Sequence, residues 1–101
     1  MKLPKKIRVD NYTYKVVPIK NQNIISSNKR HKHRKLMGEA NFPKQKIRIS
    51  TAWSRDEVAE TLLHEIIHCC AEREGLPHDE HYVGRISRRL YQVLKDNHLK
   101  F

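Results

Sequence analysis

The sequence His64-Glu65-Ile66-Ile67-His68 constrains this chain most, because it lies within a run of apolar residues. Residues four apart in an α-helix lie on one face about one turn apart, so both imidazoles would point the same way. Their nitrogens could then bind one zinc ion at roughly 2.0–2.1 Å. Glu65 directly follows the first histidine, where its carboxylate can reach a water on that ion and act as general base. We therefore predict His64 and His68 as zinc ligands and Glu65 as the catalytic residue.

The neighbouring residues predict the helix that this motif requires. Ser54-Arg55-Asp56-Glu57 has the pattern of a capping box. Apolar residues then recur at helical spacing as far as Cys70, and Gly75 and Pro77 end the helix. The alternative is that the two histidines are hydrogen-bonded core or surface residues. We favour the metal, because two histidines on a mostly buried helix need polar partners or an ion.

Patterns elsewhere in the chain predict an α+β fold. Alternating apolar and polar residues predict a hairpin at 7–9 and 12–17 closed by Pro18, and further strands at 36–41 and 46–50. Residues 20–35 are polar and basic and are expected to form a mobile loop. A second helix is predicted from His78-Asp79 to about Asn97. Its expected apolar face consists of Val83, Ile86, Leu90, Val93 and Leu94. The predicted architecture is one domain over residues 1–101, in which a small, mainly antiparallel sheet of three to four strands precedes two antiparallel helices.

Length and cysteine content limit the class of protein. A chain of 101 residues fits one domain. It has no apolar run near 18 residues, so we expect no membrane-spanning helix, and its basic N-terminus lacks the apolar stretch of a signal peptide. Its only cysteines, Cys69 and Cys70, are adjacent and are expected to stay reduced. These features predict a cytoplasmic protein.

The net charge of +10 is unevenly distributed. Residues 1–53 hold 14 Lys and Arg against 2 Asp and Glu, a net +12, whereas residues 54–101 hold 7 against 9, a net −2. This asymmetry predicts an anionic partner, either nucleic acid or an acidic protein. The basic positions at the tip of the expected loop are Lys29, Arg30, Lys32, Arg34 and Lys35. The alternative is a solvated basic surface. No aromatic residue interleaves this run, so it does not predict a base-stacking platform.

Strands followed by an HExxH helix and a second helix resemble the zincin metallopeptidase core. The resemblance is to small phage-type HExxH proteins related to the ImmA/IrrE and SprT-like families. The segments that carry it are Gly38-Glu39, Ile47-Arg48-Ile49, Leu62 to His68, and Leu90 to Asn97. It implies zinc, peptide-bond hydrolysis, a substrate strand beside the sheet edge, and the host cytoplasm if the gene belongs to a phage. The chain departs from the HExxHxxGxxH type, because Glu74-Gly75 occupies that region.

The third zinc ligand is predicted to be Glu80. A catalytic zinc usually has three protein ligands and one open position. The short Gly75-Leu76-Pro77 connection would return the second helix beside the first, and Glu80 would share its inward face with Val83. His81 remains the alternative ligand. An acidic residue here also matches the ligand set of two histidines and one glutamate that the resemblance implies.

Two further questions stay open at the level of sequence. The candidates for an additional oxyanion donor are His78, His81, Tyr82 and Tyr91. A substrate strand would pair at 36–41 or 46–50.

The competing function is a basic module that binds nucleic acid or a host protein, with a structural or inactive zinc site. The intact Glu65 favours the peptidase, because a structural site has no use for that carboxylate.

Overall fold

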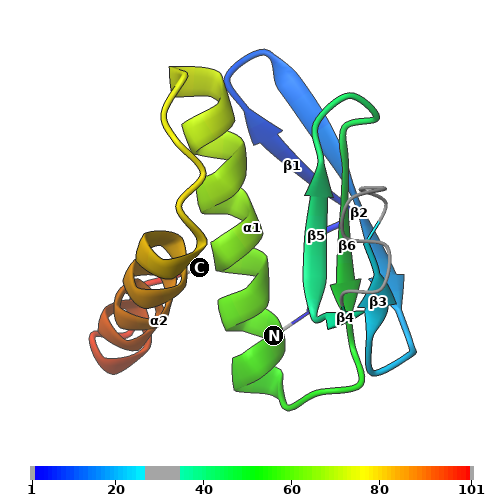
Figure 1. The fold of residues 1–101 in the computed structure, drawn as a ribbon. Helices are drawn as coiled ribbons and strands as arrows, with labels where there is room; N and C mark the ends of the chain where they lie inside the picture. Colours follow the sequence, from blue (N-terminus) through cyan, green and yellow to red (C-terminus); the bar gives the residue numbers. More distant parts are fainter. Residues whose placement is uncertain (1, 27–34, 101) are drawn as a thin grey trace.

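The computed structural model describes residues 2–26 and 35–100, and it places helix α1 between a sheet and helix α2 (Figure 1). The strands are β1 (Lys6–Val9), β2 (Tyr12–Ile19), β3 (Ile24–Ile25), β4 (Lys35–Leu36), β5 (Gly38–Asn41) and β6 (Lys46–Ser50), and the helices are α1 (Arg55–Glu74) and α2 (Glu80–Asp96). The predicted α+β class and the order of sheet and helices are confirmed.

The main sheet has four strands in the order β1-β2-β6-β5. The outer pairs β1–β2 and β5–β6 are antiparallel, but the central pair β2–β6 is parallel. The sheet is therefore mixed, rather than mainly antiparallel as the sequence predicted. A parallel pair needs a crossover between its strands, and the chain from β3 to β5 makes that crossover here. β5 is an edge strand and β6 is central, with a partner strand on each side. The segment 46–50, which was the alternative place for a substrate strand to pair, therefore has no free edge in the four-stranded sheet.

The expected end of the second strand at Pro18 is wrong. β2 does not end at Pro18 but continues to Ile19, with Pro18 opposite Ile49 of β6. The Val16 amide donates to the Lys5 carbonyl, so it faces β1. The nitrogen of Pro18, two residues later in the strand, faces the same side, at a point beyond the end of β1. The missing N–H of the proline therefore costs no ladder bond.

The loop expected at 20–35 contains structure that the sequence did not predict. β3 lies inside it and pairs with β4, with Ile24 opposite Leu36. Ile24 is buried, and this gives the polar segment an apolar anchor. The strand expected at 36–41 is split at Met37 into β4 and β5. The predicted mobile basic tip lies outside the described residues, except for Lys35 in β4.

The predicted capping of α1 is confirmed. The hydroxyl of Ser54 accepts from the Glu57 amide at 3.2 Å, and the Glu57 carboxylate accepts from the Ser54 amide at 3.3 Å. At the other end Gly75 has a φ of 67°, in the left-handed region that favours glycine. These two ends fix α1 and therefore the position of the HExxH motif within it.

The core lies between α1 and the inner face of the sheet. Val16 and Ile47 are paired across β2 and β6, and both point toward α1. Ile47 and Ile49 are fully buried, and each such side chain stabilises the fold by about 1.5–3 kcal/mol relative to an exposed one. Leu62 and Cys69 meet them from the helix. This packing holds α1 parallel to the sheet surface.

α2 runs antiparallel to α1, as predicted. Lys95 at its end contacts Asp56 at the start of α1 (2.9 Å), whereas Glu80 at its start contacts His68 (2.8 Å). The predicted apolar face is wrong in its rotation, however. Ile86 and Leu90 stay 40% and 39% exposed.

The packed face of α2 is built from smaller residues. Ser87 is 1% exposed, and a Cβ on Gly84 would lie 3.9 Å from His64 Cε1. Polar contacts and small side chains therefore set the rotation of α2, rather than the larger apolar residues. Val83 is the predicted face residue that is fully buried.

We predict that the two adjacent cysteines differ in reactivity. Burial, together with the negative charge of Glu65, raises the pKa of Cys69 to about 12. Cys70 is exposed. Because the thiolate is the nucleophile, Ellman's reagent should titrate one thiol in the native protein and two in denaturant. Cys70→Ser should abolish the native reaction, and rapid reaction of both thiols in wild-type protein would contradict the described packing.

Candidate metal centre

Helix α1 places His64 and His68 one turn apart, with both Nε2 atoms on the side that faces α2. These nitrogens are 3.2 Å apart, and the ring centroids are 4.9 Å apart. His68 is 5% exposed. Its burial lowers its pKa, which favours the neutral imidazole that a metal requires.

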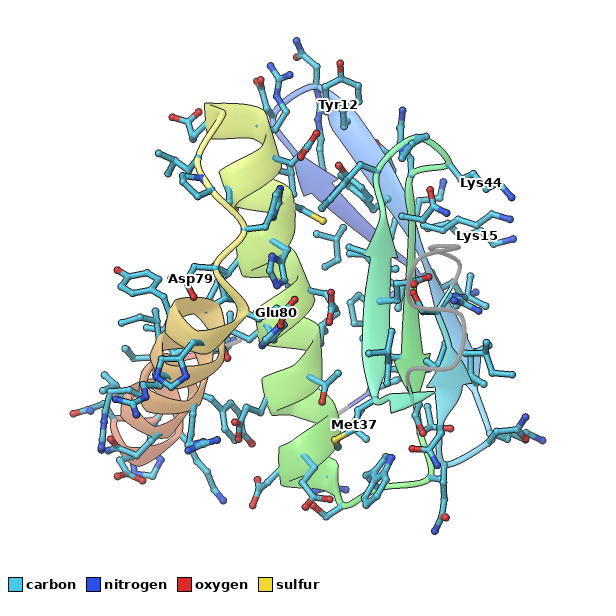
Figure 2. The ribbon with its side chains drawn as sticks, viewed as in Figure 1. Tyr12, Lys15, Met37, Lys44, Asp79 and Glu80 are labelled. Atoms are coloured by element: carbon cyan, nitrogen blue, oxygen red, sulfur yellow. The ribbon has the colours of Figure 1, made fainter. Side chains whose placement is uncertain are left out.

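Glu80 brings a carboxylate to the same point from the first turn of α2. Its Oε2 lies 3.0 Å from His64 Nε2, and its Oε1 lies 2.8 Å from His68 Nε2. Figure 2 shows Glu80 reaching from the start of α2 toward α1. The structure thus brings together the three residues that the sequence predicted as ligands.

The donor set and its spacing fit a metal ion. The three ligand atoms lie within 4.8 Å of one another. Four donors arranged tetrahedrally around zinc at about 2.05 Å would be about 3.3 Å apart, close to the 3.2 Å between the two Nε2 atoms. One Glu80 oxygen lies 3.0 Å from His64 Nε2, and the other lies 2.8 Å from His68 Nε2. Two imidazoles and one carboxylate are also the ligand set of one class of catalytic zinc site. This group of His64, His68 and Glu80 could therefore hold a metal ion.

The alternative third ligands are not part of this group. His81 is exposed, although it follows Glu80 directly. Glu72 lies one turn beyond His68 on α1, where its Oε1 contacts His78 Nε2 at 2.8 Å.

Glu65 lies beside this group and is buried against the edge strand. It is 7% exposed, and its carboxylate accepts from the backbone N–H of Ala40 in β5. Burial, together with the negative charges of Glu80 and Glu39, raises the pKa of Glu65 to about 8, against the lowering by the Ala40 amide. A cation bound nearby would favour the ionised carboxylate.

His68 is held by a chain of polar contacts that the sequence did not predict. Its Nδ1 lies 3.0 Å from Nδ1 of His78, and His78 Nε2 lies 2.8 Å from the Glu72 carboxylate. Phe42 stacks on the ring of His78 with centroids 5.1 Å apart. If Nε2 of His68 is a ligand, then its Nδ1–H donates to His78, and His78 Nε2–H donates to Glu72. Partners of this kind orient metal-binding histidines.

One of these polar contacts could have been expected from the sequence. Glu72 follows His68 by four residues, so the two share a helix face. The position of His78 depends on the turn at Gly75, which sequence spacing does not specify. His78 was expected only as a candidate oxyanion donor.

The site opens into a cavity of about 860 Å³ between α1, β5 and the start of α2. Its less polar wall consists of Leu36, Met37, Ala40, Phe42 and Pro43. Of the four candidate oxyanion donors, His78 lines this cavity. Tyr91 instead donates to Asp56 at 2.7 Å, two turns before His64, and Tyr82 is 62% exposed.

Comparison of the chain with protein-family models, with curated proteins and with solved structures finds no match. The zincin resemblance therefore stays a prediction. Among residues 2–26 and 35–100, neither helix is long and apolar enough to cross a membrane.

We predict one zinc ion per chain, bound through Glu80 rather than His81. Glu80→Ala should reduce the zinc content from about one equivalent to well below half, because it removes one of three ligands. His81→Ala is the matched control and should keep its zinc. Elemental analysis after dialysis against a weak chelator measures both. Loss of zinc from His81→Ala with retention by Glu80→Ala would make the site a three-histidine one.

We also predict that His78 strengthens metal binding without being a ligand. His78→Ala should weaken zinc affinity about 10–100-fold, the usual effect of losing such a partner. Glu72→Gln should have a smaller effect in the same direction. Competition with a chromogenic chelator measures the affinity, with His98→Ala as a control at an exposed histidine of the C-terminal segment. Unchanged affinity in His78→Ala would exclude this role.

Proposed function

We propose that this chain is a zinc-dependent metallopeptidase that uses Glu65 as its general base. The observation that carries the proposal is the convergence of His64, His68 and Glu80 within hydrogen-bonding distance of one another. Next to them lies a buried glutamate, which a purely structural metal site does not require. Zinc is proposed over other divalent ions because this ligand set is typical of catalytic zinc.

When bound, zinc would polarise the scissile carbonyl and acidify the attacking water. The residues of the chain have separate tasks. His64, His68 and Glu80 hold the ion, and His78 keeps the ring of His68 in its orientation. The Glu65 carboxylate takes a proton from the attacking water and transfers it to the leaving amine. Its burial excludes bulk water, which would otherwise compete for the carboxylate.

The proposed substrate position is the free edge of β5. Among the described residues β5 pairs with β6 along one edge only, and it borders the cavity that contains Glu65. An extended peptide that adds to this edge would gain main-chain hydrogen bonds. The Ala40 amide, which now binds the Glu65 carboxylate, lies at this border. A peptide on β5 would therefore pass the general base and the metal ligands together.

We predict that Glu65→Gln abolishes proteolysis but retains zinc. Removal of the base should lower kcat by at least about 10²-fold, whereas the three ligands remain in place. Digestion of a peptide library with zinc-loaded wild type, Glu65→Gln and chelator-treated wild type measures the effect, and elemental analysis measures the metal.

Three outcomes would contradict the proposal. Cleavage that survives both Glu65→Gln and chelation would exclude metal-dependent peptide hydrolysis by this site. Metal-dependent hydrolysis of esters or amides without any peptide cleavage would indicate a different hydrolase. Stoichiometric zinc with no turnover of any substrate would identify a structural site in a binding module.

A further inference from the structure

Three lysines form a row across the outer face of the sheet. Lys6 of β1 is opposite Lys15 of β2 in the antiparallel pair, and Lys15 is opposite Lys46 of β6 in the parallel pair. Residues opposite each other project from the same face of a sheet. Their neighbours Ile7, Tyr14 and Ile47 point inward to α1, so the lysines point away from it.

No acidic side chain within residues 2–26 and 35–100 compensates the charge of this row. All three lysines are exposed, and within the described residues none has an ion-pair partner. The outward positions of β1, β2 and β6 contain no acidic residue, and the two acids elsewhere on the sheet, Asp10 and Glu39, pair with arginines. Like charges directly opposite each other destabilise a sheet. The fold therefore maintains an unfavourable arrangement at this face.

Further lysines extend the row into a basic patch. Lys5 and Lys44 join Lys6 and Lys15 around a depression of about 570 Å³. Figure 2 shows Lys15 and Lys44 extending in the same direction, away from α1. In the part of the chain that the structure describes, no helix packs over these side chains. β3 approaches the other end of this face, where Arg48 donates to the Ile25 carbonyl at 2.9 Å.

We propose that this lysine row binds the phosphate backbone of duplex nucleic acid. Neighbouring strands are about 4.8 Å apart, so the row spans about 10 Å. One DNA strand presents a phosphate about every 3.4 Å along the helix axis, so about three phosphates match three lysines. An extended polyanion fits an exposed row better than a single small anion, which would need an enclosed site.

The composition of the face selects duplex over single strands. Single-stranded nucleic acid is held by stacking of bases on aromatic side chains, and the outward positions of β1, β2 and β6 contain no aromatic residue. Contacts limited to phosphates carry no sequence information. The row therefore binds duplex of any sequence, on the face of the sheet opposite α1 and away from the ligands on α1 and α2. Binding is independent of the proposed peptidase activity.

The test compares two variants with the same charge. Lys6→Gln/Lys15→Gln/Lys46→Gln removes the row, and Lys2→Gln/Lys20→Gln/Lys100→Gln removes three exposed lysines elsewhere. Both lower the formal charge from +10 by 3. A short, fluorescently labelled DNA duplex of mixed sequence is titrated at several salt concentrations by anisotropy. Zinc content should be unchanged in both variants, and neither variant should unfold at a lower temperature than wild type, since removal of the row relieves repulsion between the lysines.

The row variant should bind at least about tenfold more weakly than wild type. Its plot of log affinity against log salt should be shallower by about 2.7, the contribution of three phosphate contacts, and the control should keep most of the wild-type slope. Equal losses in both variants would overturn the proposal, because net charge alone would explain them.

Two further outcomes would also overturn it. In the first, the row variant retains binding, and binding is lost when the basic residues of segment 29–35 are neutralised, namely Lys29, Arg30, Lys32, Arg34 and Lys35. This result would place the nucleic-acid contact on segment 29–35. Wild type could instead bind polyglutamate but not the duplex, which would identify an acidic protein as the partner.

Discussion

The candidate site depends on the antiparallel return of α2 onto α1. Glu80 reaches His64 and His68 only because the chain reverses within the few residues after Gly75, whose left-handed conformation ends α1. Asp79 then caps α2 by accepting from the amides of His81 and Tyr82, so the first turn of α2 is fixed where the carboxylate is needed. Gly84 and Ser87 let the helices approach closely. A Cβ on Gly84 would already be in van der Waals contact with the ring of His64, at 3.9 Å from Cε1.

Burial and charge at this site favour a cation. Glu65 and His68 are both buried beside the carboxylate of Glu80, and Glu39 adds a further negative charge to the surroundings of Glu65. Without a cation, burial and then the negative charges of Glu80 and Glu39 raise the pKa of Glu65. A divalent ion would oppose this rise in pKa, because its positive charge favours ionised carboxylates. It would also take the neutral imidazole of His68 as a ligand. The arrangement is therefore costly when empty and favourable when a metal binds.

Sequence predicted the elements with strong local signals and failed where distant packing decides. The capping box at Ser54 and the glycine at 75 fixed the bounds of α1 through local hydrogen bonds, and strict alternation identified β6. The parallel pairing of β2 with β6 depends on a crossover that no local pattern encodes. β3 was missed because only Ile24 of its two residues is buried. The rotation of α2 was misjudged because residue size was taken as the guide to the packed face.

Glu80 was placed correctly for a reason that was only partly right. It was expected to share a packed face with Val83 and Ile86, but Ile86 is partly exposed. The face that meets α1 runs instead through Glu80, Val83, Gly84 and Ser87. Both faces contain Glu80, because it lies three residues before Val83 and four before Gly84. The predicted position of Glu80 beside His64 and His68 was therefore insensitive to an error in the rotation of α2 that misplaced the residues farther along the helix.

The two-residue period of the strands separates the candidate metal site from the lysine row on the opposite face of the sheet. In β2 and β6 the residues that point inward, Val16 and Ile47, pack against α1 and fix the helix that carries His64 and His68. The residues that precede them, Lys15 and Lys46, are forced to the opposite face. A one-residue slip in the pairing of either strand would bury a lysine and expose an apolar residue. The same register that builds the core therefore also aligns the outer lysines, so the sheet can hold a charged surface on one side without disturbing the site on the other.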